Sequence, residues 1–299
     1  MELLLQLVVQ GIVVGSLYAL VALGFVLIYK SSDVINLAQG EFLLLGAYIG
    51  LVFAGSLQVP FLLAVLLSLA AAFGTGLLVE RLVLRPFIGE PAISVIMATL
   101  GLSMIIRSLI HMIWGTAPRS YPPVFSQEPI QLAAGPYRVL VSEAHLWTLA
   151  AAVILLVALT AFFRYSITGI AMRASADDQQ AALSMGISVK RVLAVTWGVA
   201  AMVSGLGGVM LGNMNGITPI LSSYGLKVLP VAILGGLDSI PGAIAGGFVI
   251  GILENLAGGY LDPLVPGGGV KEVAPFAFLL LVLLIRPYGL FGKEIIERV

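Results

Sequence analysis

Long stretches without a charged residue constrain this chain more than any other feature. The first covers residues 3–29, between Glu2 and Lys30. A helix needs about 20 mostly apolar residues to cross the hydrocarbon core of a bilayer, so this stretch is long enough for one span. Charged residues make up 10% of the chain and hydrophobic residues 60%, whereas a soluble domain carries about 25% charged residues. The sequence therefore predicts an integral membrane protein with several spans.

Turn-forming residues divide the longer apolar stretches. Breaks are predicted at residues 55–60, 213–219 and 234–242, where glycine, asparagine, serine and proline cluster. The short element at 220–237 either spans the membrane or re-enters it. The pattern predicts an all-α polytopic membrane protein with about 8–10 transmembrane or re-entrant helices. The predicted membrane elements are residues 3–29, two within 42–79, 91–114, 146–163, one starting at 192, 220–237, 240–260 and 274–290.

Glycine pairs spaced by four residues recur in these elements. In a membrane, small residues let two helix backbones approach closely. We expect the pairs to pack helices within the chain; an interface between subunits is the alternative. The pairs are Gly11 and Gly15, Gly208 and Gly212, Gly242 and Gly246, and Gly247 and Gly251.

The basic residues outside the spans set the expected orientation, because they favour the cytoplasmic side. The loop at 164–191 is the most charged continuous region and is placed inside, whereas the loop at 115–145 is placed outside. This arrangement predicts an outer N-terminus and an inner C-terminus. The inner side then holds Lys30, Arg81, Arg85, Arg164, Arg173, Lys190, Arg191, Arg286, Lys293 and Arg298, and the outer side holds Arg119, Arg138 and Lys271.

Several classes of chemistry have no basis in this sequence. The chain has no cysteine, which excludes disulfides and thiolate chemistry, and its net charge of zero gives no attraction for nucleic acid. Its two histidines, His111 and His145, are too few for a histidine-built metal site. No lysine lies in a phosphate-binding G-x-x-x-x-G-K-[ST] loop. We therefore expect no catalytic site, metal or cofactor in this chain.

Polar side chains within or beside the predicted spans are candidates for a pathway through the membrane. A charged group at the centre of a bilayer costs about 2.5–3.5 kcal/mol, so its presence there indicates a function or a structural partner. For residues 36–41 a structural hydrogen-bond network is the alternative to a pathway. The candidates are Asn36, Gln39, Glu41, Asn213, Asn215, Lys227 and Glu254.

Two basic residues lie inside apolar elements. Lys227 is expected to pair with a carboxylate, either Glu41 or Glu254, or to face a hydrated cavity. Arg107 is expected to reach the outer interface with its long side chain.

The charged loop at 164–191 contains a stretch, residues 171–185, whose composition favours a helix. Asp177 and Asp178 are expected in the middle of this helix, and Gly186 supplies a stop. A short amphipathic helix of this kind suits insertion into a groove on a partner. An ordinary solvated loop helix is the alternative.

Four segments in order give this chain a resemblance to a known family. They are residues 15–20 (GSLYAL), 35–41 (INLAQGE), 165–187, and 227–247, which contains LGG, SIPG and GG. Together they resemble the membrane permease subunits of branched-chain amino acid ABC importers, and most of all the H-type subunit of the high-affinity leucine, isoleucine and valine system. The resemblance covers nearly the whole chain.

The resemblance implies an ABC importer permease fold in a bacterial inner membrane, with one transmembrane domain over residues 1–299. It implies a second homologous permease, two ATPase subunits that bind ATP and Mg, and a periplasmic binding protein. Substrates would be branched-chain amino acids or related small hydrophobic or aromatic carboxylates. Many relatives carry histidine where this chain has Gln39, so no proton-sensitive role is expected there. The coupling contact to the ATPase would involve Arg173, Ala176, Asp177, Asp178, Ala181, Gly186 and Ile187.

Two other functions remain as alternatives. A secondary transporter would use Glu41, Lys227 and Glu254 for ion or proton coupling. A passive channel would conduct a small solute such as urea. The segment at 165–187 argues against both, because neither needs a docking helix.

Overall fold

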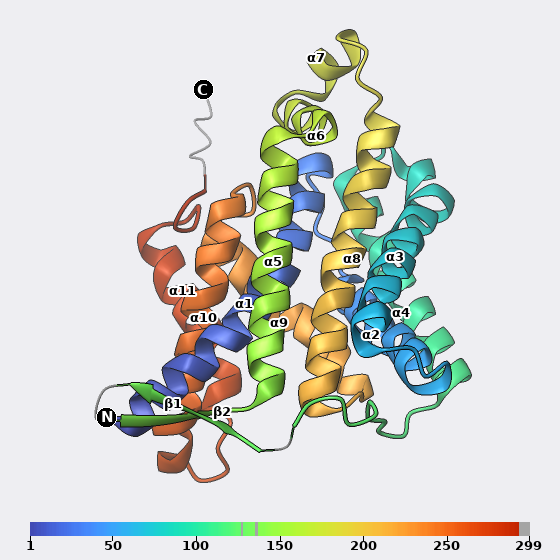
Figure 1. The fold of residues 1–299 in the computed structure, drawn as a ribbon. Coiled ribbons are helices and arrows are strands. Elements are labelled where there is room, and N and C mark those ends of the chain that lie inside the picture. The colour runs from blue at the N-terminus through green and yellow to red at the C-terminus, as the bar shows by residue number, and fades with distance from the viewer. Residues whose placement is uncertain (127, 135–136, 293–299) are drawn as a thin grey trace. The chain divides into compact units, whose positions relative to one another are not determined.

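The computed structural model describes residues 1–126, 128–134 and 137–292 (Figure 1). These residues are mostly helical with little sheet, which confirms the predicted all-α class. The helices are α1 (Glu2–Ser32), α2 (Gln39–Leu51), α3 (Phe61–Val79), α4 (Ala92–Trp114), α5 (Glu143–Tyr165), α6 (Ile167–Asp177), α7 (Gln179–Ser184), α8 (Val189–Asn215), α9 (Ser223–Gly235), α10 (Ile240–Tyr260) and α11 (Val270–Ile285).

Seven helical stretches of the described chain are long and apolar enough to cross a membrane. A shorter apolar helix occupies Pro219–Gly235, and α11 has 16 residues. Each membrane element predicted from the sequence therefore corresponds to a helix. The seven stretches are Glu2–Ser32, Gln39–Ser56, Phe61–Phe87, Ala92–Trp114, Glu143–Tyr165, Val189–Asn215 and Ile240–Leu264.

The chain forms two compact units. Unit 1 contains Met1–Val26, Phe125–Ala152 and the chain from Lys227 onward, and unit 2 contains Leu27–Val124 and Val153–Leu226.

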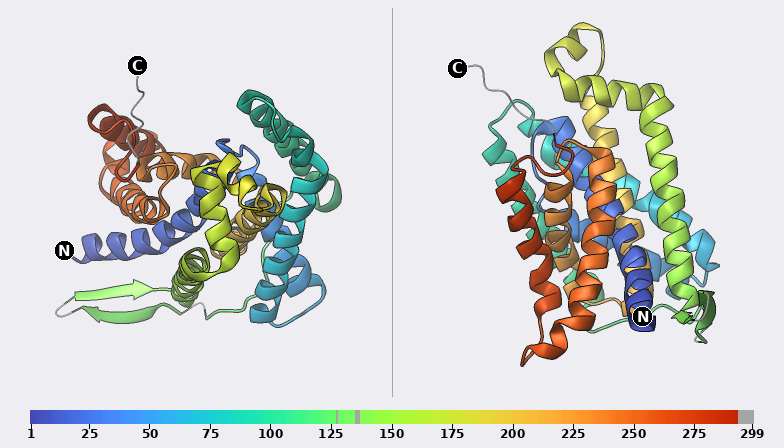
Figure 2. Two further views of the ribbon diagram at one scale, coloured as in Figure 1. Left: turned by 90° about the horizontal axis from the view of Figure 1, so that it is seen from above. Right: turned by 90° about the vertical axis from the view of Figure 1, so that its left-hand side faces the viewer.

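In unit 1, the first part of α1 packs closely on α10 through glycines. A Cβ atom added at Gly15 would lie 2.8 Å from the backbone oxygen of Gly247, and one added at Gly11 would lie 2.6 Å from the Cα of Ile252. No side chain fits at either position without moving a backbone. The expectation that these glycine pairs pack helices within the chain is confirmed. Figure 2 shows α10 and α11 side by side.

The predicted sharp turn between α9 and α10 is also present in unit 1. Gly236 has a φ of +103°, which glycine adopts without strain. Ser239 then caps α10, because its Oγ accepts a hydrogen bond from the backbone N–H of Gly242 at 3.1 Å. These two residues end one helix and begin the next within a few positions.

In unit 2, α8 is the central helix, and most of its residues are buried. It packs along both α2 and α3. Gly205 lies against the backbone of Gly46 on α2, and Gly76 of α3 lies against the backbone of Trp197. Small residues thus bring these three helices close together, as expected in a membrane.

The predicted outer loop at 115–145 contains a feature that the sequence analysis did not identify. Strands β1 (Ile130–Ala134) and β2 (Tyr137–Val141) pair antiparallel, with Ile130 opposite Val141. Gln6 of α1 accepts a hydrogen bond from the backbone N–H of Leu140 at 3.0 Å and donates one to its oxygen at 2.6 Å. The Gln6 side chain therefore satisfies hydrogen-bonding groups of the backbone on the outer edge of β2.

Candidate functional site

The loop at 164–191 forms two helices, not one. Asp178 has extended backbone angles, φ −155° and ψ 109°, and separates α6 from α7. Its carboxylate accepts hydrogen bonds from the backbone N–H groups of Gln180 at 2.8 Å and Ala181 at 2.9 Å. The expectation that Asp177 and Asp178 lie in mid-helix is therefore wrong. Aspartate competes for nearby backbone amides, which favours a helix start over a helix interior.

The predicted stop at Gly186 is confirmed. Its φ is +82°, and its N–H bonds the oxygen of Leu183 at 3.0 Å. The N–H of Ile187 bonds the oxygen of Ala182, also at 3.0 Å. These two bonds form a Schellman motif, which satisfies carbonyl groups at the end of α7.

The two helices present an exposed surface with large apolar side chains. Figure 1 shows α6 and α7 beyond the ends of α5 and α8. Ile167, Leu183 and Met185 are 87%, 57% and 84% exposed. Met172 of α6 and Ala182 of α7 are buried. Of the predicted coupling residues, Ala176 and Ile187 are half-buried, and the exposed ones are Arg173, Asp177, Asp178, Ala181 and Gly186.

Asn36 and Gln39 form a buried hydrogen-bond network at the start of α2. The Asn36 amide donates to the Gln39 oxygen at 2.9 Å, and the Asn36 oxygen accepts from the backbone N–H of Ala38 at 3.0 Å. Gln39 donates in turn to the hydroxyl of Ser204 on α8 at 2.7 Å. Both side chains are completely buried. These contacts support the structural alternative for these two residues, because they fix the start of α2 against α8.

Glu41 forms an ion pair with Arg107. The Arg107 Nη2 lies 2.5 Å from the Glu41 Oε1 and also donates to the hydroxyl of Ser222 at 3.2 Å. The Glu41 side chain is only 3% exposed, whereas that of Arg107 is 52% exposed. The expectation that Arg107 reaches the outer interface stays a prediction, and the structure adds that its guanidinium compensates a buried carboxylate.

Three buried polar atoms near this pair lack a hydrogen-bond partner among the described residues. They are Glu41 Oε2, Tyr48 Oη and His111 Nε2. Tyr48 lies two helical turns after Glu41 on α2, and His111 lies one turn after Arg107 on α4. Buried polar groups are nearly always satisfied, so this face of α2 and α4 is suited to ordered water.

A second charged cluster occurs in unit 1. The Tyr18 hydroxyl donates to the Glu254 Oε2 at 2.6 Å, and the Lys227 Nζ lies 3.8 Å from the Glu254 Oε1. Lys227 also forms an ion pair with Glu272. Of the two partners predicted for Lys227, the structure brings Glu254 to it, while Glu41 pairs with Arg107.

Glu272 and Tyr18 were missed as members of this cluster. Glu272 precedes the membrane element that the sequence predicts at 274–290, so it lies outside the predicted spans. The structure starts α11 at Val270 and places Glu272 in its first turn. Tyr18 lies within the GSLYAL segment, but its side chain is uncharged, so a search for charged groups in the spans does not select it.

Asn213 and Asn215 lie apart from the network of Asn36 and Gln39. Both occur in the last turn of α8, where Asn213 is half-buried and Asn215 exposed. Asn213 follows Ser204 by nine residues, or roughly 13 Å along the helix. The structure does not join them to the other candidates in unit 2.

Comparison with known proteins assigns a family to this arrangement. The pattern of the family described as "Branched-chain amino acid transport system / permease component" matches residues 7–285. The chain belongs to this family. Membership favours the permease over the secondary transporter and the passive channel, and it confirms the resemblance seen in the sequence.

Individual members of the permease family match over almost the whole chain. The permease protein LivH of Salmonella typhimurium is 31% identical, covering 99% of this chain and 97% of its own. BraD of Pseudomonas aeruginosa is 30% identical, covering 99% and 98%. Both are named as permease proteins of high-affinity branched-chain amino acid transport systems.

A solved structure supports the fold. PsaBC from Streptococcus pneumoniae in complex with Fab has a TM-score of 0.51 and 16% sequence identity, covering 96% of this chain and 93% of that chain. At this identity the likeness extends to the fold alone.

Proposed function

We propose that this chain is the permease subunit of an ATP-binding-cassette importer and forms half of a translocation pathway with a second, homologous permease. Two ATPase subunits bind ATP and Mg, and a periplasmic binding protein delivers the substrate. The substrates are branched-chain amino acids or related small hydrophobic or aromatic carboxylates. The relatives named above support this substrate class.

The observation that carries the proposal is the capped helix pair α6 and α7. Ser166 caps α6, since its Oγ accepts from the N–H of Gly169 at 2.9 Å, and Asp178 caps α7. Both helix starts are thus fixed by side chains. The pair nevertheless exposes Ile167, Leu183 and Met185, and exposed apolar surface of this kind favours a protein partner.

The connection to the membrane helices gives the pair a mechanical role. Only residues 185–188 separate α7 from α8, and Val189 at the start of α8 is buried. A displacement of α7 by a closing ATPase is transmitted to α8, which packs on α2 and α3. In this mechanism ATP binding changes which side of the membrane the pathway faces, and release of ADP and phosphate resets it.

The orientation follows from the charges of unit 2. Lys30, Arg81, Arg85, Arg164 and Lys190 belong to the helix ends that share one end of this unit with α6 and α7. Basic residues favour the cytoplasm, so we assign this end to the inside. Arg119 pairs by backbone hydrogen bonds with Ile217, beyond the opposite end of α8. Lys293 and Arg298, expected on the inner side, lie outside the described residues.

Co-purification tests the proposal directly. The chain is extracted in mild detergent from its native membranes, and the proteins that accompany it are identified by mass spectrometry. We expect an ATP-binding subunit and a second permease. A chain that is folded and repeatedly recovered alone contradicts the proposal.

A matched variant identifies the contact surface. Met185→Glu places a charge on the exposed apolar surface and should release the ATPase subunit. Val124→Glu, on a 43% exposed apolar residue of the loop at 115–145, is the control and should retain it.

A further inference from the structure

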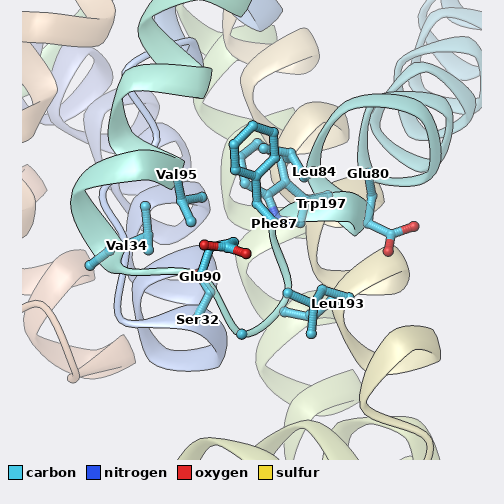
Figure 3. Close-up of a pocket in the computed structure, with 12 residues that line it drawn as sticks. Ser32, Val34, Glu80, Leu84, Phe87, Glu90, Val95, Leu193 and Trp197 are labelled. Carbon is cyan, nitrogen blue, oxygen red and sulfur yellow. The ribbon is translucent and has the colours of Figure 1, made fainter.

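A cavity of about 220 Å³ lies in unit 2, at the end that carries α6 and α7. Its walls come from the end of α1, the segment between α3 and α4, and the first turns of α4 and α8 (Figure 3). The lining is more apolar than polar, and Trp197 packs edge-on against Phe42 with ring centroids 6.4 Å apart. The apolar and aromatic side chains are those of Val34, Leu84, Phe87, Val95, Leu193 and Trp197.

Two acidic residues line this cavity, the buried Glu80 and the exposed Glu90, and Glu80 already has a basic partner. Glu80 is buried and accepts hydrogen bonds from Arg85, from Nε at 3.2 Å and from Nη2 at 3.0 Å. Glu90 forms no ion pair with any residue that the structure describes. Figure 3 shows its carboxylate between Val34 and Phe87. The cavity thus combines one negative charge with an apolar, partly aromatic wall.

We propose that this cavity binds an organic ammonium group that carries a small apolar body, as an apolar α-amino acid does. The Glu90 carboxylate receives the ammonium through charge-assisted hydrogen bonds. Phe87 and Trp197 also line the cavity, and aromatic rings attract cations. The aliphatic residues cover the apolar body. Ala92 begins α4 at the same cavity, and a helix N-terminus favours the carboxylate of the amino acid.

The position of the cavity gives the bound compound a regulatory effect. Leu193 and Trp197 belong to the first turns of α8, which residues 185–188 connect to α7. A ligand held between these residues and Glu90 restrains the start of α8 relative to α4. Amino acid that accumulates inside the cell therefore slows its own import. This physiological role rests on the proposed function, whereas the ammonium site itself does not.

Binding to the purified full-length chain tests the site without any partner subunit. The chain is held in a maltoside detergent, which contains no amine, and binding is measured by isothermal titration. The probes are leucine, 3-methylbutylamine, which lacks the carboxylate, and 4-methylpentanoate, which lacks the ammonium. Leucine and the amine should bind, and the carboxylate alone should bind at least tenfold more weakly. Equal binding of 4-methylpentanoate, or no binding of leucine and the amine to folded protein, overturns the proposal.

Two pairs of variants locate the site. Glu90→Gln should weaken leucine binding at least tenfold, whereas Glu2→Gln, at the exposed start of α1, should stay within twofold of the parent. Val95→Phe should fill the cavity and block binding, whereas Ile93→Phe, on a 61% exposed residue of the same helix turn, should not. Folding of each variant is checked by size-exclusion chromatography. If leucine binds but neither cavity variant weakens its binding, the site lies elsewhere and the proposal is wrong.

A phospholipid with an ethanolamine headgroup presents the same ammonium. The titration is therefore repeated in nanodiscs of phosphatidylglycerol, alone or with phosphatidylethanolamine. Loss of leucine binding only when phosphatidylethanolamine is present assigns the site to the lipid headgroup, and retained binding assigns it to the free amino acid. Failure of these titrations leaves the co-purification result unaffected, so the regulatory site and the importer function are tested separately.

Discussion

At the scale of single residues, the ion pair of Glu41 and Arg107 makes the clearest prediction. Arg107→Met leaves the buried Glu41 carboxylate without its cation. Removing one member of a buried pair costs about 3–5 kcal/mol, and since Arg107 is half-exposed we expect about 3 kcal/mol. The measurement is denaturant unfolding in detergent. Arg81→Met, on an exposed residue, is the control and should change stability by less than about 0.5 kcal/mol.

The double variant Glu41→Gln with Arg107→Met separates charge from packing. It removes both charges, so it should recover most of the stability lost in the single variant. A double variant as unstable as Arg107→Met alone would mean that the guanidinium acts through packing or through Ser222.

The second prediction for single residues concerns Lys227. Lys227→Met removes the cation beside Glu254, and we expect uptake to fall at least tenfold. Glu254→Gln in the same chain removes the uncompensated carboxylate and should restore folding. If uptake stays lost in the folded double variant, the cluster serves the pathway; if it returns, the cluster is structural. Unchanged uptake in Lys227→Met refutes a pathway role for this lysine.

At the scale of elements, the start of α7 depends on the Asp178 cap. Asp178→Ala removes the acceptor for two backbone N–H groups and should destabilise α7 by about 1 kcal/mol. Because α7 has only six residues, we expect ATP hydrolysis to continue while uptake falls several-fold. Asp178→Asn preserves an N-cap side chain and should keep the two activities coupled. Loss of coupling in both variants would instead indicate that the charge contacts the partner.

A variant of Asp177 tests the exposed surface of α6 and α7 rather than the cap of α7. It is exposed at the end of α6, so Asp177→Lys should leave the fold intact. Reversal of its charge should uncouple ATP hydrolysis from uptake. Fully coupled uptake in the variant would count against a docking role for this face. Glu128→Lys, the same reversal from acid to base on an exposed residue of the loop at 115–145, serves as the control.

Local chemistry explains which elements could be predicted from the sequence. Glycine and proline end helices through their own backbone preferences, so the breaks near Gly216 and Gly236 and the stop at Gly186 were predictable. The break at Asp178 was not, because the surrounding residues favour helix and only the cap geometry reveals it. The hairpin of β1 and β2 is short and is supported by Gln6, a residue 134 positions from Leu140.

The partners of the polar candidate residues could not be predicted from the sequence either. Arg107 lies 66 residues from Glu41, and Tyr18 lies 236 residues from Glu254. No periodicity links such residues, since their contact depends on how the helices pack. The ionisable residues could therefore be identified as candidates, but their pairing could not.

At the scale of the whole molecule, the source of energy distinguishes the importer from its rivals. Cells that express the complete set of subunits take up labelled leucine, and its accumulation is followed after treatment with arsenate or with a proton ionophore. If ATP drives the importer, leucine accumulation should fall more than tenfold with arsenate. Accumulation should stay mostly unchanged when the ionophore is added and ATP is maintained. A secondary transporter responds in the opposite way, and a channel never accumulates leucine above the outside concentration.

Asp177→Lys in the same cells is the matched control, because it should remove the ATP-dependent part of the accumulation while the protein remains in the membrane. Accumulation that survives both arsenate and Asp177→Lys would place the driving force outside α6 and α7 and would contradict the coupling mechanism.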